Sequence, residues 1–327
     1  MIAKPDLLKD SLGRPIVSSR KALQKMLMGT LGGFLLGMGC AILREKRQDI
    51  FHSLEDLQED VQGTLVGVFP KVQALRGGRL LKVNVNNEQL LNALHDPQNV
   101  LSKAAESLYT NLRFLPLEAG VKSLVVASNS SHDGKTTVVT YLAKAAASMG
   151  QRVLVVDSNM VVSQIHTWLD VPNYEGLNEV LTKGMDPNQL IQRSPQQTNL
   201  FVLPSGQVSQ ASRKLLSSQQ MQHLMGQLHT MFDLVLYDTP PLQSYPDANF
   251  LGLHADGLLV VVSIKKTRRS QVLKLFKKLQ SARIPLLGVV ANQVKLAHAD
   301  SVRESDRSLD GMEDDFEIFR VSSSQNS

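Results

Sequence analysis

Short apolar runs alternate with amphipathic stretches through the middle and later parts of this chain. The runs are rich in Val, Leu and Ile, which is typical of strands buried in a parallel sheet. The predicted strands are 123–128, 152–157, 200–204, 233–238, 258–263 and 286–291. Helical periodicity lies between them, most clearly over 135–149 and 270–282. The alternation predicts an α/β fold, a doubly wound and mainly parallel sheet that binds its ligand at the carboxyl ends of the strands.

An earlier apolar stretch, residues 26–43, runs 18 residues without a charged side chain. That length is close to the lower limit for a helix that spans a bilayer. Gly29, Gly33 and Gly37 recur on one helix face, where small residues allow two helices to approach closely. A secretory signal peptide is the alternative, but the polar lead and the lack of a small-residue cleavage site weigh against it. We therefore expect one transmembrane helix.

Composition restricts the classes of protein that remain. The chain has 327 residues, of which 43% are hydrophobic, enough for one α/β core and smaller segments. Its single cysteine, Cys40, excludes an internal disulfide and fits a reducing compartment. The net charge of +5 is not gathered into a stripe that would bind nucleic acid. Basic residues instead flank the apolar stretch, where a membrane explains them better.

These patterns divide the chain into five parts. We expect an N-terminal polar segment over 1–25, the transmembrane helix over 26–43, and a juxtamembrane segment and linker over 44–100. The α/β domain should follow over 101–299. The acidic remainder, 300–327, is expected to be disordered.

The clearest chemistry lies where the strand at 123–128 ends. A small-polar loop leads into Gly134, Lys135 and Thr136 at the start of a helix, which is the order of a P-loop. Loop N–H groups and the helix N-terminus attract phosphate, Lys135 reaches the β/γ-phosphates, and Thr136 offers a hydroxyl to Mg²⁺. A strand–turn–helix with a solvated lysine is the simpler alternative. The candidate nucleotide-binding residues here are Ser130, Ser131, His132, Asp133, Gly134, Lys135, Thr136 and Thr137.

Two further predicted strands end in a carboxylate, Asp157 and Asp238. Carboxylates at the carboxyl ends of parallel strands are where P-loop proteins hold Mg²⁺ or its waters. We expect Thr136 and Asp238 to bind the metal. Each aspartate taken singly is equally consistent with a strand-end cap, so it is the combination with the loop that favours a nucleotide site.

This combination resembles the bacterial tyrosine kinases (BY-kinases) of exopolysaccharide and capsule biosynthesis, which are relatives of the MinD/ParA ATPases. The resemblance covers nearly the whole predicted domain. It implies ATP and Mg²⁺ as cofactors, Lys135, Asp157 and Asp238 as catalytic residues, and Asn292 beside the adenine. The matching motifs are Ser131 to Thr137, Val155 to Val161, Asp238-Thr239-Pro240-Pro241 with Asp247-Ala248, and Leu287 to Asn292.

The resemblance extends to the segment before the domain. Residues 51–57 and 65–70 look like the cytoplasmic exit of the second transmembrane helix in polysaccharide chain-length regulators. It therefore implies a single-pass protein of the bacterial inner membrane, with its P-loop domain in the cytoplasm. Its expected partners are co-polymerase or export proteins, and copies of itself through the glycine face of the membrane helix.

Several departures from the family pattern bear on activity. His132 replaces a loop glycine, Asn159 replaces a carboxylate and Val161 replaces an arginine. The tyrosine cluster that such kinases phosphorylate near their C-terminus is absent, because no tyrosine follows Tyr245. These departures leave two alternatives to an active kinase. One is a catalytically impaired regulatory subunit, and the less favoured one is a MinD-like ATPase, whose loop lysine is replaced here by Ser130.

Overall fold

The computed structural model describes residues 19–61, 65–72, 97–117, 120–207, 214–243, 245 and 247–295. The chain divides into two compact units, Met1–Asp49 and Ile50–Ser327. Most of the predicted N-terminal polar segment, much of the predicted linker and all of the predicted acidic tail lie outside the described residues.

The first unit contains helix α1 (Ser19–Gln48), which is continuous through the predicted membrane span. None of the helices, over the part of the chain that the structure describes, meets the combined requirement of length and apolar character for crossing a membrane. The side chains of residues 41–43, at the end of the predicted span, lie outside the described set.

The second unit is built on one eight-stranded sheet with the strand order β1-β8-β7-β2-β6-β3-β5-β4. All pairings are parallel except that of β4 with β5, which confirms the predicted α/β class. The strands are β1 (Leu65–Pro70), β2 (Ser123–Ser128), β3 (Val153–Asp157), β4 (Gln192–Arg193), β5 (Leu200–Leu203), β6 (Leu234–Asp238), β7 (Gly257–Ser263) and β8 (Leu286–Val294).

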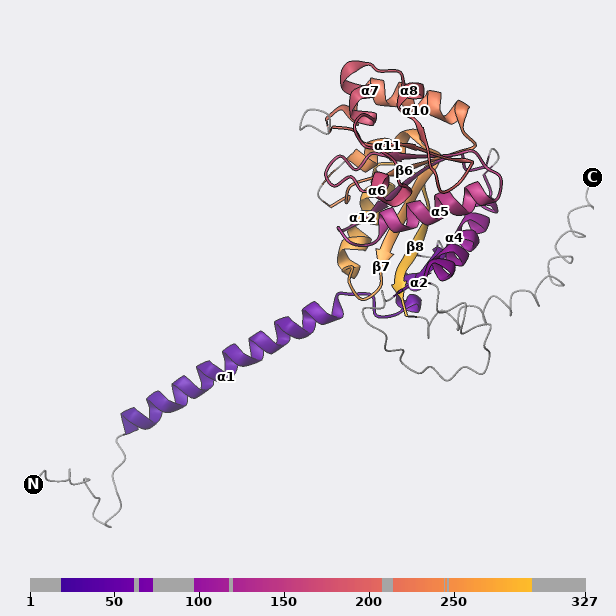
Figure 1. The fold of residues 1–327 in the computed structure, drawn as a ribbon. Coiled ribbons are helices and arrows are strands. Elements are labelled where there is room, and N and C mark those ends of the chain that lie inside the picture. The colour runs from indigo at the N-terminus through magenta and orange to yellow at the C-terminus, as the bar shows by residue number, and fades with distance from the viewer. Residues whose placement is uncertain are drawn as a thin grey trace, which may run out of the picture. The chain divides into compact units, whose positions relative to one another are not determined.

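Helices cover both faces of this sheet, as a doubly wound fold requires (Figure 1). One face packs against α4 (Pro97–Arg113), α5 (Lys135–Ser148) and α6 (Ile165–Leu169). The opposite face packs against α2 (Leu54–Val61), α7 (Leu177–Lys183), α8 (Pro187–Leu190), α10 (Gln219–Met231), α11 (Asp247–His254) and α12 (Arg269–Ser281).

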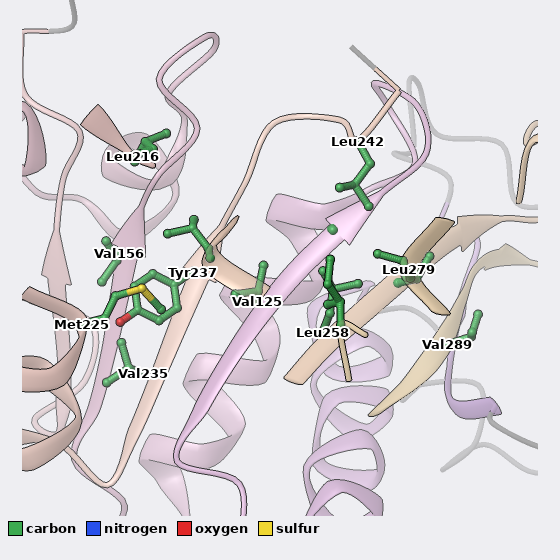
Figure 2. Packing of buried hydrophobic residues seen from close by; sticks show 14 of the residues in the cluster. Val125, Val156, Leu216, Met225, Val235, Tyr237, Leu242, Leu258, Leu279 and Val289 are labelled. Atoms are coloured by element: carbon green, nitrogen blue, oxygen red, sulfur yellow. The ribbon is translucent and has the colours of Figure 1, made fainter. Parts of the chain in front are cut away.

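Alternate residues of each central strand enter the two layers of the core. Val125 and Val156 face the layer that contains α10 and α12, whereas Leu124 and Val155 face the layer that contains α5. Figure 2 shows part of the first layer, in which Val125 and Val156 flank Tyr237 as its register partners on the neighbouring strands. Because the central strands are covered on both sides, their sequences are apolar almost throughout.

The six predicted strands are present, with ends that differ by up to three residues. The boundary of the domain differs more. Residues 65–70, expected in a juxtamembrane segment, form β1, which pairs with β8 through Leu65 opposite Val289 and Val68 opposite Ala291. The compact unit therefore begins at Ile50 and not at residue 101.

Packing explains why β1 belongs to the sheet. Phe69 is fully buried, and the Asn111 side chain on α4 donates a 3.0 Å hydrogen bond to the carbonyl of Val66. A Cβ on Gly67 would lie 2.9 Å from Leu108 Cδ1, so α4 can approach β1 this closely only because residue 67 is glycine. A short apolar run with β-branched residues that meets an unpaired strand edge is stabilised better as a strand than as a solvated connector.

Candidate functional site

The loop between β2 and α5 contains two residues in the left-handed region. Gly134, immediately before the helix, has φ +91°, and a Cβ there would lie 1.9 Å from Nδ2 of Asn292. His132 also has positive φ, 69°, although its side chain is exposed. A left-handed conformation costs a non-glycine residue about 1–2 kcal/mol, so other contacts must hold the loop in this shape.

Asp133 supplies much of that restraint. Its buried carboxylate accepts a 2.9 Å hydrogen bond from the Ser130 N–H and a 2.9 Å bond from the Thr267 hydroxyl. The Thr267 hydroxyl in turn accepts from the Ser263 N–H at 3.0 Å, which connects the loop to the end of β7. Burial raises the pKa of Asp133, and the hydrogen bonds and Lys135 oppose that rise. The side chain of Asp133 therefore holds the loop from within.

Asn292, expected beside the adenine, lies against the same loop. Its Nδ2 donates a 2.7 Å hydrogen bond to the Asp133 carbonyl, and its Oδ1 accepts from the Gln293 N–H at 2.8 Å. The amide is buried and tied to the backbone in both directions. In this arrangement Asn292 restrains the turn at Gly134 from the end of β8.

Lys135 lies in the first turn of α5 and folds back over the loop. Its Nζ donates a 3.0 Å hydrogen bond to Ser128 Oγ, which itself donates to the Ser130 carbonyl at 2.6 Å. Burial lowers the pKa of Lys135, while Asp238 and Asp133 act in the opposite direction. The ammonium is thus held inside the loop, where the phosphates of a nucleotide are bound in P-loop proteins.

Two carboxylates lie at the ends of adjacent strands near this loop, and one of them, Asp238, acts on the charge of Lys135. Asp157 ends β3 and Asp238 ends β6, where they are register partners. Both are fully buried. Burial, and then the proximity of Asp238, raises the pKa of Asp157 to about 7, whereas burial raises that of Asp238 to about 6 against the effect of Lys135. Two buried carboxylates side by side favour a bound cation or a shared proton.

Thr136, which is predicted to bind the metal together with Asp238, contacts that carboxylate. Its hydroxyl donates a 2.9 Å hydrogen bond to Asp238 Oδ2, while Asp238 Oδ1 is buried without a hydrogen-bond partner in the described structure. An orphaned carboxylate oxygen beside a hydroxyl is a donor set that suits Mg²⁺. No cluster of three His, Cys, Asp or Glu side chains able to hold a metal occurs among the residues placed by the structure. A magnesium ion at Thr136 and Asp238 would therefore share its coordination with phosphate and water.

Asp157 is surrounded by hydrogen-bond donors that sequence reasoning did not identify. Its Oδ2 accepts a 2.7 Å bond from the Ser163 hydroxyl and a 3.3 Å bond from the Ile165 N–H, and its Oδ1 accepts from the Asn159 N–H at 3.2 Å. Ser163 Oγ also lies 3.1 Å from Nδ1 of His166. The signal in the sequence was a serine six residues after the carboxylate, within a loop whose path no periodicity reveals.

The structure thus separates the predicted residues into three groups. Lys135, Thr136 and Asp157 each interact with Asp238 or pair with it in register at the carboxyl edge of the sheet. The side chains of Asp133 and Asn292 pack behind the loop. The remaining loop residues stay accessible to different degrees: Ser131 and His132 are exposed, and Ser130, Gly134 and Thr137 are half-buried.

The α/β domain is similar to proteins of known family. The family model of an AAA domain matches residues 121–287. Tyrosine-protein kinase YwqD of Bacillus subtilis (strain 168) is 33% identical over 205 residues, 63% of this chain and 86% of that protein. The solved kinase domain of Escherichia coli tyrosine kinase ETK is 26% identical with a TM-score of 0.63, covering 73% of this chain and 92% of that structure.

A longer relative matches only in part. Putative tyrosine-protein kinase EpsB of Ralstonia solanacearum is 28% identical over 281 residues, which is 84% of this chain but 36% of that protein. The chain therefore spans about a third of that relative's length. The Bacillus protein, in contrast, is matched over most of its length, and the AAA-domain match covers the P-loop and both carboxylates. On this evidence the chain belongs to the family of bacterial tyrosine-protein kinases.

Proposed function

We propose that this chain is an ATP-dependent protein-tyrosine kinase whose chemistry takes place between the P-loop and the two strand-end aspartates. The observation that carries the proposal is the convergence of Lys135 and Thr136 with Asp157 and Asp238 in one buried, charged site. Such a site matches the needs of phosphoryl transfer, which depends on positioning and on stabilising charge more than on covalent chemistry.

Each residue has a distinct part in this proposal. The ammonium of Lys135 leaves Ser128 and binds the β/γ-phosphates, where its charge stabilises the transferring phosphoryl group. Thr136 and Asp238 hold Mg²⁺, which when bound neutralises charge on the phosphates. Asp157 receives the proton of the acceptor tyrosine; its raised pKa places it near the physiological range, as a general base requires.

We infer a cellular role in the assembly of exopolysaccharide or capsular polysaccharide, where the kinase would act on chain length, polymerisation or export. The partners would be a co-polymerase or export proteins of the inner membrane. Support comes from the family membership and from α1, whose central side chains, among them Met26, Leu27 and Phe34, are exposed and apolar. Residues 26–43 would anchor the chain in the membrane. The P-loop domain would lie on the cytoplasmic side, because it needs ATP and ATP is found there.

A regulatory subunit with impaired catalysis is the second candidate, and Asn159 favours it. The Asn159 Oδ1 accepts a 3.3 Å hydrogen bond from the Val162 N–H, so a local turn uses the side chain that stands where the family pattern has a carboxylate. In that case the site would bind nucleotide and present a conformation to partners without transferring phosphate.

Both candidate functions require the site to bind nucleotide, and calorimetric titration of Mg-ATP into the full chain tests this. We expect binding that is lost in Lys135→Ala and kept in Lys122→Ala, since Lys122 is exposed outside the loop. Phosphorylation of an added Glu-Tyr copolymer then separates the two candidates. Binding without transfer would leave the regulatory subunit, and no binding with the fold intact would refute a nucleotide site.

A further inference from the structure

The carboxyl ends of β1, β8 and β7 carry basic side chains that the proposed phosphoryl transfer does not use. These three strands are parallel neighbours in the sheet, so their carboxyl ends share one edge. Neighbouring strands are about 4.8 Å apart, which keeps the residues that follow them close together. Five of those residues are exposed and form a cluster that we call the basic edge: Lys71 after β1, Lys295 after β8, and Lys265, Lys266 and Arg268 after β7.

Backbone hydrogen bonds fix the basic edge in place. The Lys71 N–H donates to the Val294 carbonyl at 2.7 Å, which joins the end of β1 to the end of β8. The Ile264 N–H donates to the Asn292 carbonyl at 2.9 Å, which joins the loop after β7 to the same end of β8. The positive charges therefore belong to one surface and not to three independent loops.

The sequence around the basic edge leaves its charge largely uncompensated. Residues 257–299 contain no aspartate or glutamate. On α2, the Asp60 carboxylate is paired with Arg269, which is not part of the basic edge. Asp56 of the same helix accepts hydrogen bonds from two backbone N–H groups just before it. An excess of positive charge on one surface attracts an anionic partner.

The compact unit that begins at Ile50 also starts at this edge. Ile50 forms an antiparallel bridge with Arg268, and the Lys265 N–H donates a 2.8 Å hydrogen bond to the Phe51 carbonyl. The side chain of Phe51 is fully buried, so this starting point is anchored in the core. The basic edge therefore lies directly beside the place where the unit connects to the preceding chain.

The chain between the proposed membrane span, residues 26–43, and Ile50 is short. Helix α1 continues as far as Gln48. At about 1.5 Å for each helical residue and at most about 3.8 Å for each of the last two, Ile50 lies within roughly 15 Å of the end of the span. Headgroups occupy roughly 5–8 Å of this distance, and the remainder is about one Debye length at 0.1 M salt. Headgroup charge would therefore act on the basic edge.

We propose that the basic edge binds the anionic lipid headgroups of the membrane that anchors the chain. The inference rests on the proposed anchoring by residues 26–43. Lysine and arginine side chains near such a surface are attracted by the negative potential of the cytoplasmic leaflet. Thr267 lies between Lys266 and Arg268 and donates a 2.9 Å hydrogen bond to Asp133 of the P-loop. Lipid binding would therefore hold the nucleotide site next to the bilayer.

Reconstitution of the full chain into nanodiscs tests this in the absence of nucleotide. One set of discs contains phosphatidylcholine alone, and the other contains phosphatidylglycerol as well. Acetylation of lysines, followed by peptide mass spectrometry, should be about fivefold or more slower at Lys265 and Lys266 in the anionic discs, and high salt should abolish the difference. Lys122, just before β2 at the opposite edge, and Lys278, in the last turn of α12, are exposed controls that should react equally in both.

Two full-length variants with the same net charge test the assignment to the basic edge. One carries Lys71→Glu, Lys266→Glu and Arg268→Glu and keeps Lys265 as the reporter. The other changes three exposed lysines of α12 outside the basic edge: Lys274→Glu, Lys277→Glu and Lys278→Glu. With the fold of both intact by circular dichroism, only the first should lose the effect of phosphatidylglycerol on Lys265.

The remaining results would each overturn the proposal. Equal acetylation in both discs, with the chain co-eluting with them, would exclude lipid binding and leave the anchoring standing. Failure to co-elute with either disc would refute the anchoring and this inference together. Slow acetylation in both discs that disappears when residues 300–327 are removed would assign the basic edge to the acidic tail of the chain. Equal loss of the lipid effect in both variants would mean that no particular surface is responsible.

Discussion

The hydroxyl of Thr136 donates a 2.9 Å hydrogen bond to Oδ2 of Asp238, a residue 102 positions later in the chain. The bond joins the first turn of α5 to the end of β6. Within the described part of the chain, Oδ1 of Asp238 is buried without a hydrogen-bond partner, so only one of the two carboxylate oxygens is hydrogen-bonded. A carboxylate oxygen without a hydrogen-bond partner can still accept a ligand, which supports the proposal that Thr136 and Asp238 bind Mg²⁺.

Thr136→Ala should weaken Mg-ATP binding by about tenfold or more, because it removes both a proposed metal ligand and the donor to Asp238. Binding of ATP without Mg²⁺ should change much less. Titration calorimetry with and without Mg²⁺ measures the difference, and Thr136→Ser should restore it. Thr230→Ala on the exposed side of α10 serves as the control. Equal losses with and without the metal would contradict a role in holding Mg²⁺.

Gly150, outside the loop, is a matched control for Gly134, because both glycines have nearly the same positive φ. The φ angles of Gly134 and Gly150 are +91° and +90°, but a Cβ on Gly134 would meet Asn292 whereas a Cβ on Gly150 would meet nothing within 4 Å. Both Ala variants therefore bear the same conformational cost of about 1–2 kcal/mol. We expect only Gly134→Ala to lose Mg-ATP binding, because only there must the Asn292–Asp133 hydrogen bond give way.

Chemical denaturation of the full-length Gly134→Ala and Gly150→Ala variants would show whether the alanine at positive φ lowers the free energy of unfolding equally in both. If Gly150→Ala lost nucleotide binding to the same extent, the effect would come from general destabilisation and the clash with Asn292 would be irrelevant.

The sequence was most informative where structure is local. The strand ending at Ser128 and the helix starting at Lys135 were predicted at the correct residues, because a buried β-branched run and a loop–helix junction are visible within a few positions. The positions of Asp157 and Asp238 at one edge of the sheet could also be predicted, because the carboxyl ends of parallel strands share one edge. The α/β class was predictable for the same reason.

What the sequence left out depends on contacts between distant residues. Nothing local in Leu65–Pro70 shows that it pairs with β8, which lies more than 200 positions later. The hydrogen bond between Asp133 and Thr267 also joins residues that are far apart in the chain. The sequence therefore could not show that the Asp133 carboxylate is buried behind the loop. Ser163 lies in a loop without periodicity, and only the folded chain brings its hydroxyl to Asp157.

The extension of the domain to Ile50 makes its own prediction through α2. Leu57 is fully buried there, so Leu57→Ala should lower the free energy of unfolding by about 2–5 kcal/mol. Arg269 of α12 forms a bidentate ion pair with Asp60, which lies on α2 as Leu57 does. The side chain of Arg269 is 46% exposed. Arg269→Ala should therefore cost less than about 1 kcal/mol. Denaturant unfolding of the full chain measures both, and a neutral Leu57→Ala would argue that α2 is not part of the domain.

Ser163 should set the pH at which Asp157 works as a base. Its hydroxyl bonds the charged carboxylate and so lowers a pKa that burial and Asp238 raise to about 7. Transfer requires the deprotonated form, so kcat/KM should increase as the pH rises through that value. Removing the hydroxyl in Ser163→Ala takes away a contact that favours the charged form, and the midpoint should move to higher pH.

The pH profile of kcat/KM on a Glu-Tyr copolymer checks this, with Ser163→Thr expected to keep the midpoint of the unmodified chain because it keeps the hydroxyl. Asp157→Asn should lose the rise altogether. A lower rate with an unchanged midpoint in Ser163→Ala would mean that Ser163 only supports the fold of the loop. An upward shift would instead identify Ser163 as a positioning residue for the base, since loss of packing alone does not move a titration in that direction.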